Sequence, residues 1–353
     1  MISKYLPRYP RPITVIGAGG IVKDAHLPAY RKAGFRVQTI CDVNAERARA
    51  LAHSFAITAV YNDVDQAINA APHGTVFDLA TPPGAFEEIL HKLPDGSAVL
   101  IQKPMGVSIE QARAIRSICR EKRLTAAVNF QLRFAPAILK ARELIENGLI
   151  GDLHDMEVRI TVFTPWHLWT FLEGLPRMEI LNHSIHYLDL MRSFLGEPRA
   201  VWARTVKHPS VPKLASTRSN IILDYGDMLR SNITTNHGHN FGFRHQESYV
   251  KWEGTKGAIK TRLGLLMDYP LGVPDEFEYC TLNEGSPPEW QSLKIEGSWF
   301  PDGFIGTMGS LMCYLETSLE KLPTSIEDAY HTMELVEAAY ESNDSGGTPV
   351  RHD

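Results

Sequence analysis

The fold of the first part of this chain is decided by residues 13–42, ITVIGAGGIVKDAHLPAYRKAGFRVQTICD. The stretch opens with a short run of mostly β-branched apolar residues, Ile13–Ile16, which is typical of a buried strand. A cluster of glycines follows at once, then a segment of helical character, then a second apolar run, Val37–Cys41, and Asp42. This order of strand, glycine turn, helix, strand and acid is typical of a βαβ unit that binds a dinucleotide.

The glycines have separate physical roles in such a unit. Gly17 permits a tight turn after the strand, and Gly19 removes a side chain that would block a pyrophosphate. The helix that follows offers unpaired N–H groups and the positive end of its dipole to the phosphates. Val22 stands at the third glycine position, so the context rather than the bare motif carries the interpretation, and a purely structural turn is the alternative. We expect the cofactor to lie across Gly17, Gly19, Gly20 and Ile21.

The acid at the end of the second strand indicates which dinucleotide binds. Asp42 is placed to accept hydrogen bonds from the ribose hydroxyls of the adenosine, and its charge would repel a ribose 2′-phosphate. NAD is therefore the expected cofactor. Arg47 lies about one helical turn further along the chain and keeps NADP open as an alternative.

Composition and charge exclude several classes of protein. The chain has 353 residues, enough for two domains, with 44% hydrophobic and 22% charged residues, as in globular proteins. A net charge of −5 argues against nucleic-acid binding, which needs a clustered positive face. The four cysteines lie far apart without a C-x-x-C pair, so we expect neither disulfides nor zinc, and a reducing cytoplasm. Because neither a signal peptide nor a membrane-spanning run is visible, no membrane partner is expected.

Strands and helices alternate in the first half of the chain. Apolar runs at residues 76–80, 98–101 and 125–130 are typical of strands, and helical segments separate them. This alternation predicts right-handed βαβ units and a doubly wound parallel sheet of the Rossmann type. Thr81 and Pro82 follow one of these strands at the carboxyl edge of the sheet, where ligands bind in such folds.

Lys103 comes directly after the strand at residues 98–101. Pro104 favours extended backbone at this lysine. A lysine at the sheet edge can donate to a substrate hydroxyl or carbonyl oxygen, and burial would lower its pKa toward the range useful in acid–base catalysis. The alternative is a solvated loop lysine, which the position taken alone favours.

Four stretches of the chain form one combined set of motifs: Gly17-Ala-Gly-Gly-Ile with His26-Leu-Pro, Ala80-Thr-Pro-Pro, Gln102-Lys-Pro, and Asn129-Phe-Gln-Leu-Arg133-Phe-Ala-Pro136. They resemble the Gfo/Idh/MocA family, named after glucose-fructose oxidoreductase and inositol dehydrogenase. That family usually has glutamate where this chain has Gln102, and often histidine where it has Phe86, but the lysine is kept. The resemblance implies that Lys103 is catalytic. Asn129 and Arg133 follow a strand of the first domain, and we expect them to position the cofactor or the hinge between domains.

The pattern changes after a helical segment at residues 137–147. Alternating stretches then follow one another without helices between them, which predicts a large, mostly antiparallel open sheet. We therefore expect an α/β dinucleotide-binding domain, residues 1–128, and an α+β domain for substrate binding and oligomerisation, residues 129–353. The resemblance suggests that the last helix, residues 326–342, packs back on the first domain. It also suggests that the open sheet pairs with another subunit in a homodimer or homotetramer.

A polar stripe runs along a mostly apolar helix at residues 179–196, EILNHSIHYLDLMRSFLG. At about 100° per residue, one narrow face carries Asn182, His186, Asp189 and Ser193, with apolar residues on both sides. A helix that is apolar on most of its surface is buried, and a polar stripe on it needs partners. The stripe therefore either lines a cleft or forms an internal network, such as a His186–Asp189 pair.

The family motif D-x-G-x-H-x-x-D appears on this helix as Asn182-His-Ser184-Ile-His186-Tyr-Leu-Asp189. The resemblance favours the cleft and implies that His186 is the catalytic histidine. Asn182 replaces the usual aspartate, and an asparagine can hold a hydroxyl but cannot accept a proton. Ser184 replaces the usual glycine. The neighbouring His183 points to another side of the helix, so a structural role is favoured for it.

Two further clusters leave alternatives open. Residues 163–169 can form an apolar wall for a sugar ring, with Trp166 as a substrate contact, or a packed loop. Asn236-His-Gly-His239 places two histidines on one strand face. Because no third ligand is visible nearby, a site-lining or surface strand is favoured and no metal site is expected.

The combined expectation is a nicotinamide-dependent oxidoreductase acting on a sugar, a polyol or a related derivative. His186 is the expected general base in oxidation, because imidazole titrates near neutrality, while Lys103 polarises the oxygen and Asn182 orients the substrate or the imidazole. The particular sugar, its reacting carbon and the direction of the reaction stay open. One alternative is a non-redox enzyme that hydrolyses or isomerises glycosides with tightly held NAD. Another is a regulatory protein that binds NAD and senses a sugar.

Overall fold

The computed structural model describes residues 2–269, 271–317 and 319–351. The chain divides into two compact units. Unit 1 comprises Met1–Leu139 and Gly297–Met333, and unit 2 comprises Lys140–Glu296 and Glu334–Asp353. The domain boundary predicted near residue 128 stays a prediction.

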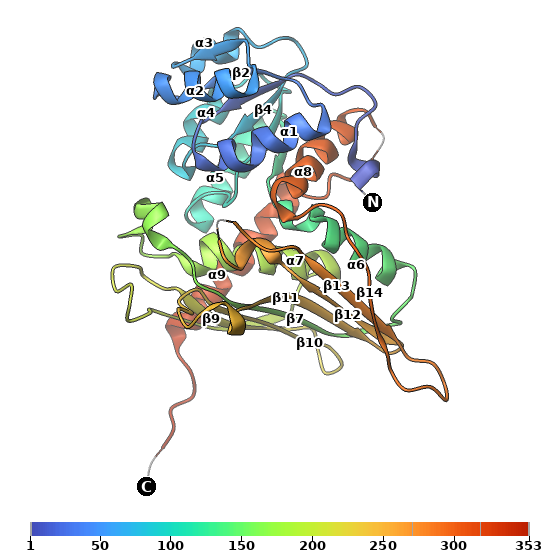
Figure 1. The fold of residues 1–353 in the computed structure, drawn as a ribbon. Coiled ribbons are helices and arrows are strands. Elements are labelled where there is room, and N and C mark those ends of the chain that lie inside the picture. The colour runs from blue at the N-terminus through green and yellow to red at the C-terminus, as the bar shows by residue number, and fades with distance from the viewer. Residues whose placement is uncertain (1, 270, 318, 352–353) are drawn as a thin grey trace. The chain divides into compact units, whose positions relative to one another are not determined.

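Unit 1 is built on a parallel sheet, of which Figure 1 labels β2 and β4. Its described residues form six strands in the order β3-β2-β1-β4-β5-β6. The strands are β1 (Ile13–Ile16), β2 (Val37–Cys41), β3 (Ala59–Tyr61), β4 (Val76–Leu79), β5 (Ala98–Ile101) and β6 (Thr125–Val128). The predicted Rossmann-type sheet is thereby confirmed. Because the strand order reverses at β1, the carboxyl ends of β1 and β4 flank the switch point at which such sheets bind ligands.

Helices follow the strands of unit 1. They are α1 (Leu27–Ala33), preceded by a π-helical turn η2 (Val22–His26), then α2 (Ala45–Phe55), α3 (Val64–Asn69), α4 (Phe86–Lys92) and α5 (Ile109–Glu121). The side chains of Asn44, Asp63 and Ser108 accept hydrogen bonds from the backbone N–H three residues later, at the starts of α2, α3 and α5. These caps satisfy donors that a helix start leaves unpaired, which explains why the helices begin there.

A long helix from the distant part of the sequence, α8 (Trp299–Leu315), completes unit 1. The sequence patterns did not predict it. Its side chains enter the hydrophobic core that also holds β1 and α1. An added Cβ would lie only 2.5 Å from Gln131 O at Gly303, and 1.9 Å from Tyr5 O at Gly309. These glycines therefore allow α8 to approach the 3₁₀ turns η4 (Gln131–Phe134) and η1 (Ile2–Tyr5) closely.

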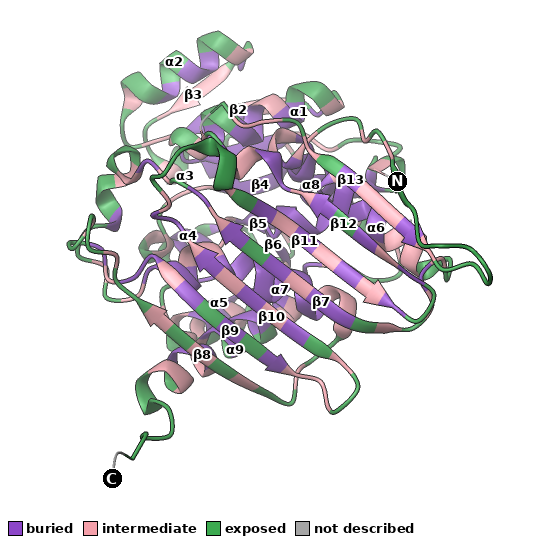
Figure 2. Ribbon diagram, turned by 60° about the horizontal axis from the view of Figure 1, so that its bottom comes forward, coloured by how far each residue is buried: buried purple, intermediate pink, exposed green. Residues whose placement is uncertain are grey.

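Unit 2 is built on a sheet of eight strands within the described ranges, in the order β14-β13-β12-β11-β7-β10-β9-β8. The strands are β7 (Leu153–Thr161), β8 (Ala200–Val206), β9 (Arg218–Asp224), β10 (Arg230–Asn236), β11 (Glu247–Gly254), β12 (Gly257–Arg262), β13 (Glu276–Thr281) and β14 (Trp290–Ser292). β7 and β10 pair in parallel and the other neighbours are antiparallel, which confirms the predicted sheet. Figure 2 shows buried and exposed residues alternating along several of these strands, as expected for a sheet with one covered face.

Helix α7 (Ile185–Leu195) covers part of the inner face of this sheet, and the π-helical turn η6 (Ile180–Ser184) precedes it. The Phe194 ring lies 5.2 Å from the Trp252 ring of β11, and Ser231 of β10 donates to the Met191 sulfur. Two further α-helices of the described residues, α6 (Pro136–Glu146) and α9 (Ile326–Ser345), each contribute residues to both units. Within the described residues, no helix is both long and apolar enough to cross a membrane.

Candidate functional site

The glycine turn after β1 has the geometry that its sequence predicted. Gly17 has φ of +115°, and an added Cβ would lie 2.5 Å from Ala80 O at the end of β4. Gly17 is therefore required by both backbone conformation and space. At Gly19 an added Cβ would meet no atom of the described residues within 4 Å. The space beside Gly19 is open, as the approach of a pyrophosphate requires.

Asp42 is fixed at the end of β2 by two backbone hydrogen bonds. Its Oδ2 accepts from Ala18 N at 2.7 Å, and its Oδ1 accepts from Asn44 N at 2.8 Å. Because an ionised carboxylate has about four acceptor positions, each oxygen keeps capacity for a ribose hydroxyl. The carboxylate thus links the glycine turn to the start of α2 and is held in position beside both.

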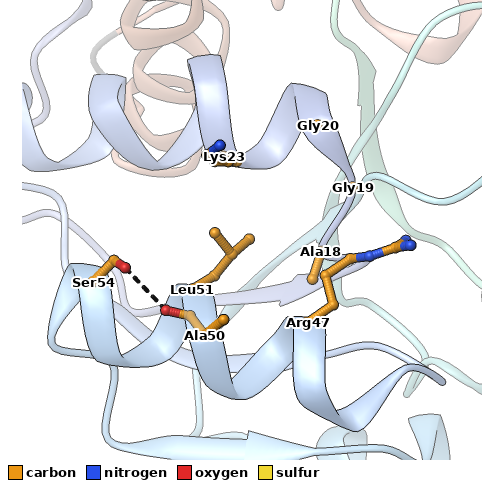
Figure 3. A pocket seen from close by; sticks show the side chains of 8 residues that line it. All are labelled: Ala18, Gly19, Gly20, Lys23, Arg47, Ala50, Leu51 and Ser54. Atoms are coloured by element: carbon orange, nitrogen blue, oxygen red, sulfur yellow. Dashed lines mark hydrogen bonds between the residues drawn. The ribbon is translucent and has the colours of Figure 1, made fainter. Parts of the chain in front are cut away.

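A pocket of about 350 Å³ lies against this turn (Figure 3). Its lining comes from the turn and from two helical segments: Ala18, Gly19, Gly20, Lys23, Arg47, Ala50, Leu51 and Ser54. The turn offers backbone N–H groups, Lys23 and Arg47 offer positive charge, and Leu51 offers an apolar surface. These groups fit the pyrophosphate and adenosine portion of a dinucleotide.

Thr81 and Pro82 follow β4 at the carboxyl edge of the sheet. The hydroxyl oxygen of Thr81 is buried, and it has no hydrogen-bond partner among the described residues. A buried hydroxyl without a partner costs free energy, so this oxygen is a candidate ligand contact beside the glycine turn. Pro82 is exposed.

Lys103 follows β5 at the same edge. Part of its surface remains exposed, yet desolvation lowers the pKa of its ammonium group to about 8. A lysine that titrates near pH 8 can hold or release a proton under ordinary conditions, as acid–base chemistry requires. Its catalytic role stays a prediction, since geometry within unit 1 alone does not test it.

A buried hydrogen-bond network lies beneath this edge. His26 Nδ1 is 2.7 Å from Asp78 Oδ2, and Tyr30 Oη donates to the same oxygen at 2.8 Å. Asn129 Nδ2 donates to Gln102 Oε1 at 2.9 Å and lies 3.4 Å from His26 Nε2. Thr307 of α8 donates to Asn129 Oδ1. Asn129 is therefore tied to the residue before Lys103, which is the place where glutamate is usual in the resembled family.

Asp78 and His26 have no predicted role of their own, although His26 belongs to one of the family motifs. A signal for Asp78 was present, because an acid in the middle of the apolar run VFDLA must find a buried partner. Nothing in the sequence indicated which partner. Arg133 donates to Pro323 O and Asp328 Oδ2 and so ties η4 to the start of α9. Its expected part in positioning the cofactor or the hinge stays a prediction.

The helix with the predicted polar stripe begins with a π-helical turn. Ile185 N donates to Ile180 O, which is the five-residue spacing of that conformation. The regular 100° spacing therefore holds only from Ile185 onward, so the helix faces predicted for Asn182 and His183 at that spacing do not apply. The Asn182 side chain donates to Met178 O at 3.0 Å, and His186 and Asp189 are buried. The roles of Asn182 and His186 stay predictions.

Glu179, for which the sequence predicts no role, is fully buried at the start of this turn. Its oxygens accept hydrogen bonds from Ser184 Oγ and Ser219 Oγ, and Oε1 lies 3.4 Å from His237 Nε2. Burial opposes ionisation, but the hydrogen bond and charge of His237 and the two serine hydroxyls outweigh it and lower the pKa of Glu179. Ser184, which stands where the family motif has glycine, therefore supports a buried carboxylate.

Trp166 lies against two histidines from separate segments. Its ring is 5.3 Å from the His183 ring and 5.6 Å from the His237 ring. Trp166 and Trp169 also pack against a small core of Leu172, Met178 and Leu214, which favours the packed-loop alternative for this segment. A substrate contact of Trp166 stays a prediction.

His237 and His239 follow the end of β10, and no group of three metal-ligating side chains occurs in the part of the chain that the structure describes.

Comparison with known proteins agrees with this geometry. Residues 12–130 match an oxidoreductase family with an NAD-binding Rossmann fold, and residues 138–260 match the GFO/IDH/MocA C-terminal domain. The chain belongs to the Gfo/Idh/MocA oxidoreductase family. It is therefore an oxidoreductase with an NAD-binding fold, as the glycine turn and Asp42 predicted.

Relatives of known activity fall in the same family. The chain is 24% identical over 339 residues to D-apiose dehydrogenase of Paraburkholderia graminis, which covers 95% of this chain and 88% of that enzyme. It is 26% identical over 215 residues to D-glucoside 3-dehydrogenase of Escherichia coli, covering 60% of each chain. These relatives are named as dehydrogenases of different sugars.

Solved structures show the same fold. An oxidoreductase from Agrobacterium radiobacter in complex with NAD⁺, L-tartaric acid and magnesium has a TM-score of 0.79 at 22% identity, covering 96% of this chain and 98% of that chain. Levoglucosan dehydrogenase in complex with NADH and levoglucosan has a TM-score of 0.75 at 18% identity, with the same coverage.

Proposed function

We propose that this protein is an NAD-dependent dehydrogenase or reductase that acts on a hydroxyl group of a sugar, a polyol or a sugar derivative. The observation that carries the proposal is the open glycine turn beside the carboxylate of Asp42. Relatives named for apiose, glucosides and inositol support the substrate class. When bound, NAD supplies the hydride chemistry that none of the side chains can provide.

The residues of unit 1 hold the cofactor in this proposal. The backbone from Gly17 to Ile21 receives the pyrophosphate, and Asp42 receives the adenosine ribose. Thr81 and Pro82 lie beside the turn, where the Thr81 hydroxyl, which no described residue hydrogen-bonds, finds a ligand partner. Asn129, fixed by Gln102 and Thr307, keeps this edge of the sheet rigid.

In this proposal three polar side chains transfer the proton and hold the substrate. His186 takes the proton of the substrate hydroxyl during oxidation, and Lys103 donates to the same oxygen and stabilises its developing negative charge. Asn182 holds the substrate or the imidazole in place but accepts no proton. Lys103 belongs to unit 1, whereas His186 and Asn182 belong to unit 2. Substitution therefore has to test whether the three residues act on the same substrate.

The test is an NADH-fluorescence screen of pentoses, hexoses, inositols and their acids. Lys103→Ala and His186→Ala should each lose at least about a hundredfold in kcat while NAD binding is retained. Unchanged turnover in both variants would refute the assigned roles. Exchange of labelled hydrogen without net NADH release would favour a non-redox enzyme, and binding without turnover across the panel would favour a sensor.

Cofactor preference is tested by NAD and NADP titration. Wild type should bind NAD more tightly, since the carboxylate of Asp42 repels a 2′-phosphate. Asp42→Asn should narrow the difference between the two cofactors, because the charge is removed while Lys23 and Arg47 still line the pocket. Preference for NADP in the wild type would contradict this assignment.

We also propose that the protein forms a homodimer or homotetramer through the exposed face of the unit 2 sheet. Trp202 of β8 and Ile222 of β9 are directly paired on that face, and 58% and 50% of their surfaces are exposed. Adjacent large apolar side chains on an open sheet are typical of a protein interface.

A further inference from the structure

A relay of polar side chains inside unit 2, one ion-pair contact followed by one hydrogen bond, ends on the partly buried Thr164, which has no assigned role. The Nε2 atom of His237 lies 3.4 Å from Oε1 of the buried Glu179 carboxylate. On the other side of the ring, Nδ1 of His237 is hydrogen-bonded to Thr164 Oγ1 at 3.1 Å. The order is carboxylate, imidazole, hydroxyl. Glu179 is 0% exposed and His237 is 1% exposed, whereas Thr164 is only partly buried.

The carboxylate end of the relay is rigid. Glu179 accepts from the hydroxyls of Ser184 and Ser219, and these two donors come from the π-helical turn η6 and from β9. Because the lone pair of an unprotonated nitrogen would face the Glu179 carboxylate at 3.4 Å and be repelled by it, this contact favours the proton on His237 Nε2. Nδ1 is then the ring nitrogen that is hydrogen-bonded to Thr164, and this hydrogen bond determines where the Thr164 hydroxyl points.

The hydroxyl end of the relay is fixed by backbone as well. Thr164 N donates to His237 O at 3.1 Å, so the two residues are joined by main-chain and side-chain bonds. Thr164 follows β7, one residue before Pro165 and two before Trp166. The His183 and His237 rings lie 4.7 Å apart, which connects the relay to the residue next to Asn182.

We propose that Thr164 is a substrate-binding residue whose hydroxyl meets a hydroxyl group of the sugar or polyol, and that Glu179 and His237 are positioning residues that fix its orientation. This inference rests on the proposed function. A surface hydroxyl rotates freely, but one that is bonded to a buried imidazole is preorganised, and preorganisation lowers the entropy cost of binding. The relay would therefore select substrates that carry a hydroxyl at the matching position.

The experiment uses the full-length protein with NAD and a panel of D-glucose, D-xylose and myo-inositol, each with its deoxy analogues. Thr164→Val keeps the shape but removes the hydroxyl, and it should raise KM about tenfold with kcat changed less than about twofold. Thr164→Ser should behave as the wild type. Thr161→Val, at a partly buried threonine that ends β7 three residues earlier, is the matched control and should have no effect. For the one deoxy analogue that lacks the hydroxyl contacted by Thr164, the KM of Thr164→Val should equal that of the wild type.

The positioning role is tested by a double-mutant cycle. Glu179→Gln should raise KM as Thr164→Val does, and the double variant should be no worse than Thr164→Val alone, because the relay acts only through that hydroxyl. Additive losses in the double variant would show that Glu179 is merely structural. If Glu179→Gln does not fold, His237→Gln enters the same cycle.

The outcomes separate this inference from the proposed function. If the wild type turns over a panel member but Thr164→Val retains its KM, the inference alone is overturned. If the wild type neither turns over nor binds any member by calorimetry in the presence of NAD, both are overturned. A KM effect that persists with every deoxy analogue would also contradict direct contact between Thr164 and a substrate hydroxyl.

Discussion

Two glycines in one turn illustrate how differently a single residue type can act. Gly17 is required by the protein itself, because its φ is +115° and a Cβ would meet Ala80 O. Gly19 has no such conflict among the described residues, so its lack of a side chain serves the ligand. The same sequence motif thus combines a folding requirement and a binding requirement.

Substitution by alanine should separate these two requirements. Gly17→Ala should lower the free energy of unfolding by at least about 1–3 kcal/mol. Gly19→Ala should leave stability unchanged and weaken NAD binding at least about tenfold, because its methyl group would occupy the path of the pyrophosphate. Thermal unfolding and NAD titration of both variants check this. Equal stability losses in the two variants would contradict the distinction.

Lys103 should make stability depend on pH in a defined direction. Desolvation lowers its folded-state pKa to about 8, while an unfolded lysine titrates near pH ~10.4. Below pH ~8 both states carry the proton and the folded state bears the cost of a desolvated charge. Between the folded-state and the unfolded-state pKa, Lys103 has released its proton in the folded protein but keeps it in the unfolded chain. The contribution of Lys103 to the free energy of unfolding therefore rises with pH in this range.

Lys103→Met should therefore raise the free energy of unfolding at pH 7, by about 1–3 kcal/mol. The gain should shrink as the pH approaches 10. Urea unfolding of wild type and variant at pH 7 and at pH 9.5 measures it. A variant that is less stable than the wild type at pH 7 would contradict the idea that burial opposes the charge.

At the scale of elements, the close approach of α8 depends on residues with no side chain. Gly306 would place a Cβ 2.4 Å from Phe134 Cβ, and Gly309 would place one 1.9 Å from the Tyr5 carbonyl oxygen. In an exposed helix, alanine is about 1 kcal/mol more favourable than glycine. Packing reverses that preference here, which explains why a glycine-containing segment forms a long buried helix.

Gly309→Ala should therefore destabilise unit 1, by about 1–3 kcal/mol, since backbone atoms of η1 would have to move. Gly20→Ala is the matched control, because an added Cβ there would meet only the Asp24 side chain at 3.9 Å. Thermal unfolding of the two variants without cofactor is the measurement. If Gly309→Ala is as stable as the wild type, the close packing of α8 is not essential.

At the scale of the whole molecule, the open sheet should determine the oligomeric state. Replacing Trp202 and Ile222 by glutamate places like charges opposite each other on the exposed face, and the proposed oligomer should dissociate. Light scattering coupled to size-exclusion chromatography measures the mass. Val350→Glu, at another exposed apolar residue, is the control and should leave the mass unchanged. A monomeric wild type would contradict the proposal.

Local patterns determined much of this protein. The strands of unit 1 and the glycine turn depend on residues near each other in the sequence, so the alternation of strands and helices and the conformational freedom of glycine predict them. The family motifs likewise marked Lys103 and His186 by position alone.

Only the tertiary structure decided which distant residues meet. The sequence showed an acid in a buried strand at Asp78, but folding chose His26 and Tyr30 as its partners. Helix α8 joins unit 1 from more than a hundred residues beyond the sheet, and Glu179 meets His237 across the strands of unit 2. These contacts depend on packing between elements, and periodicity within one element carries no information about the element that packs against it.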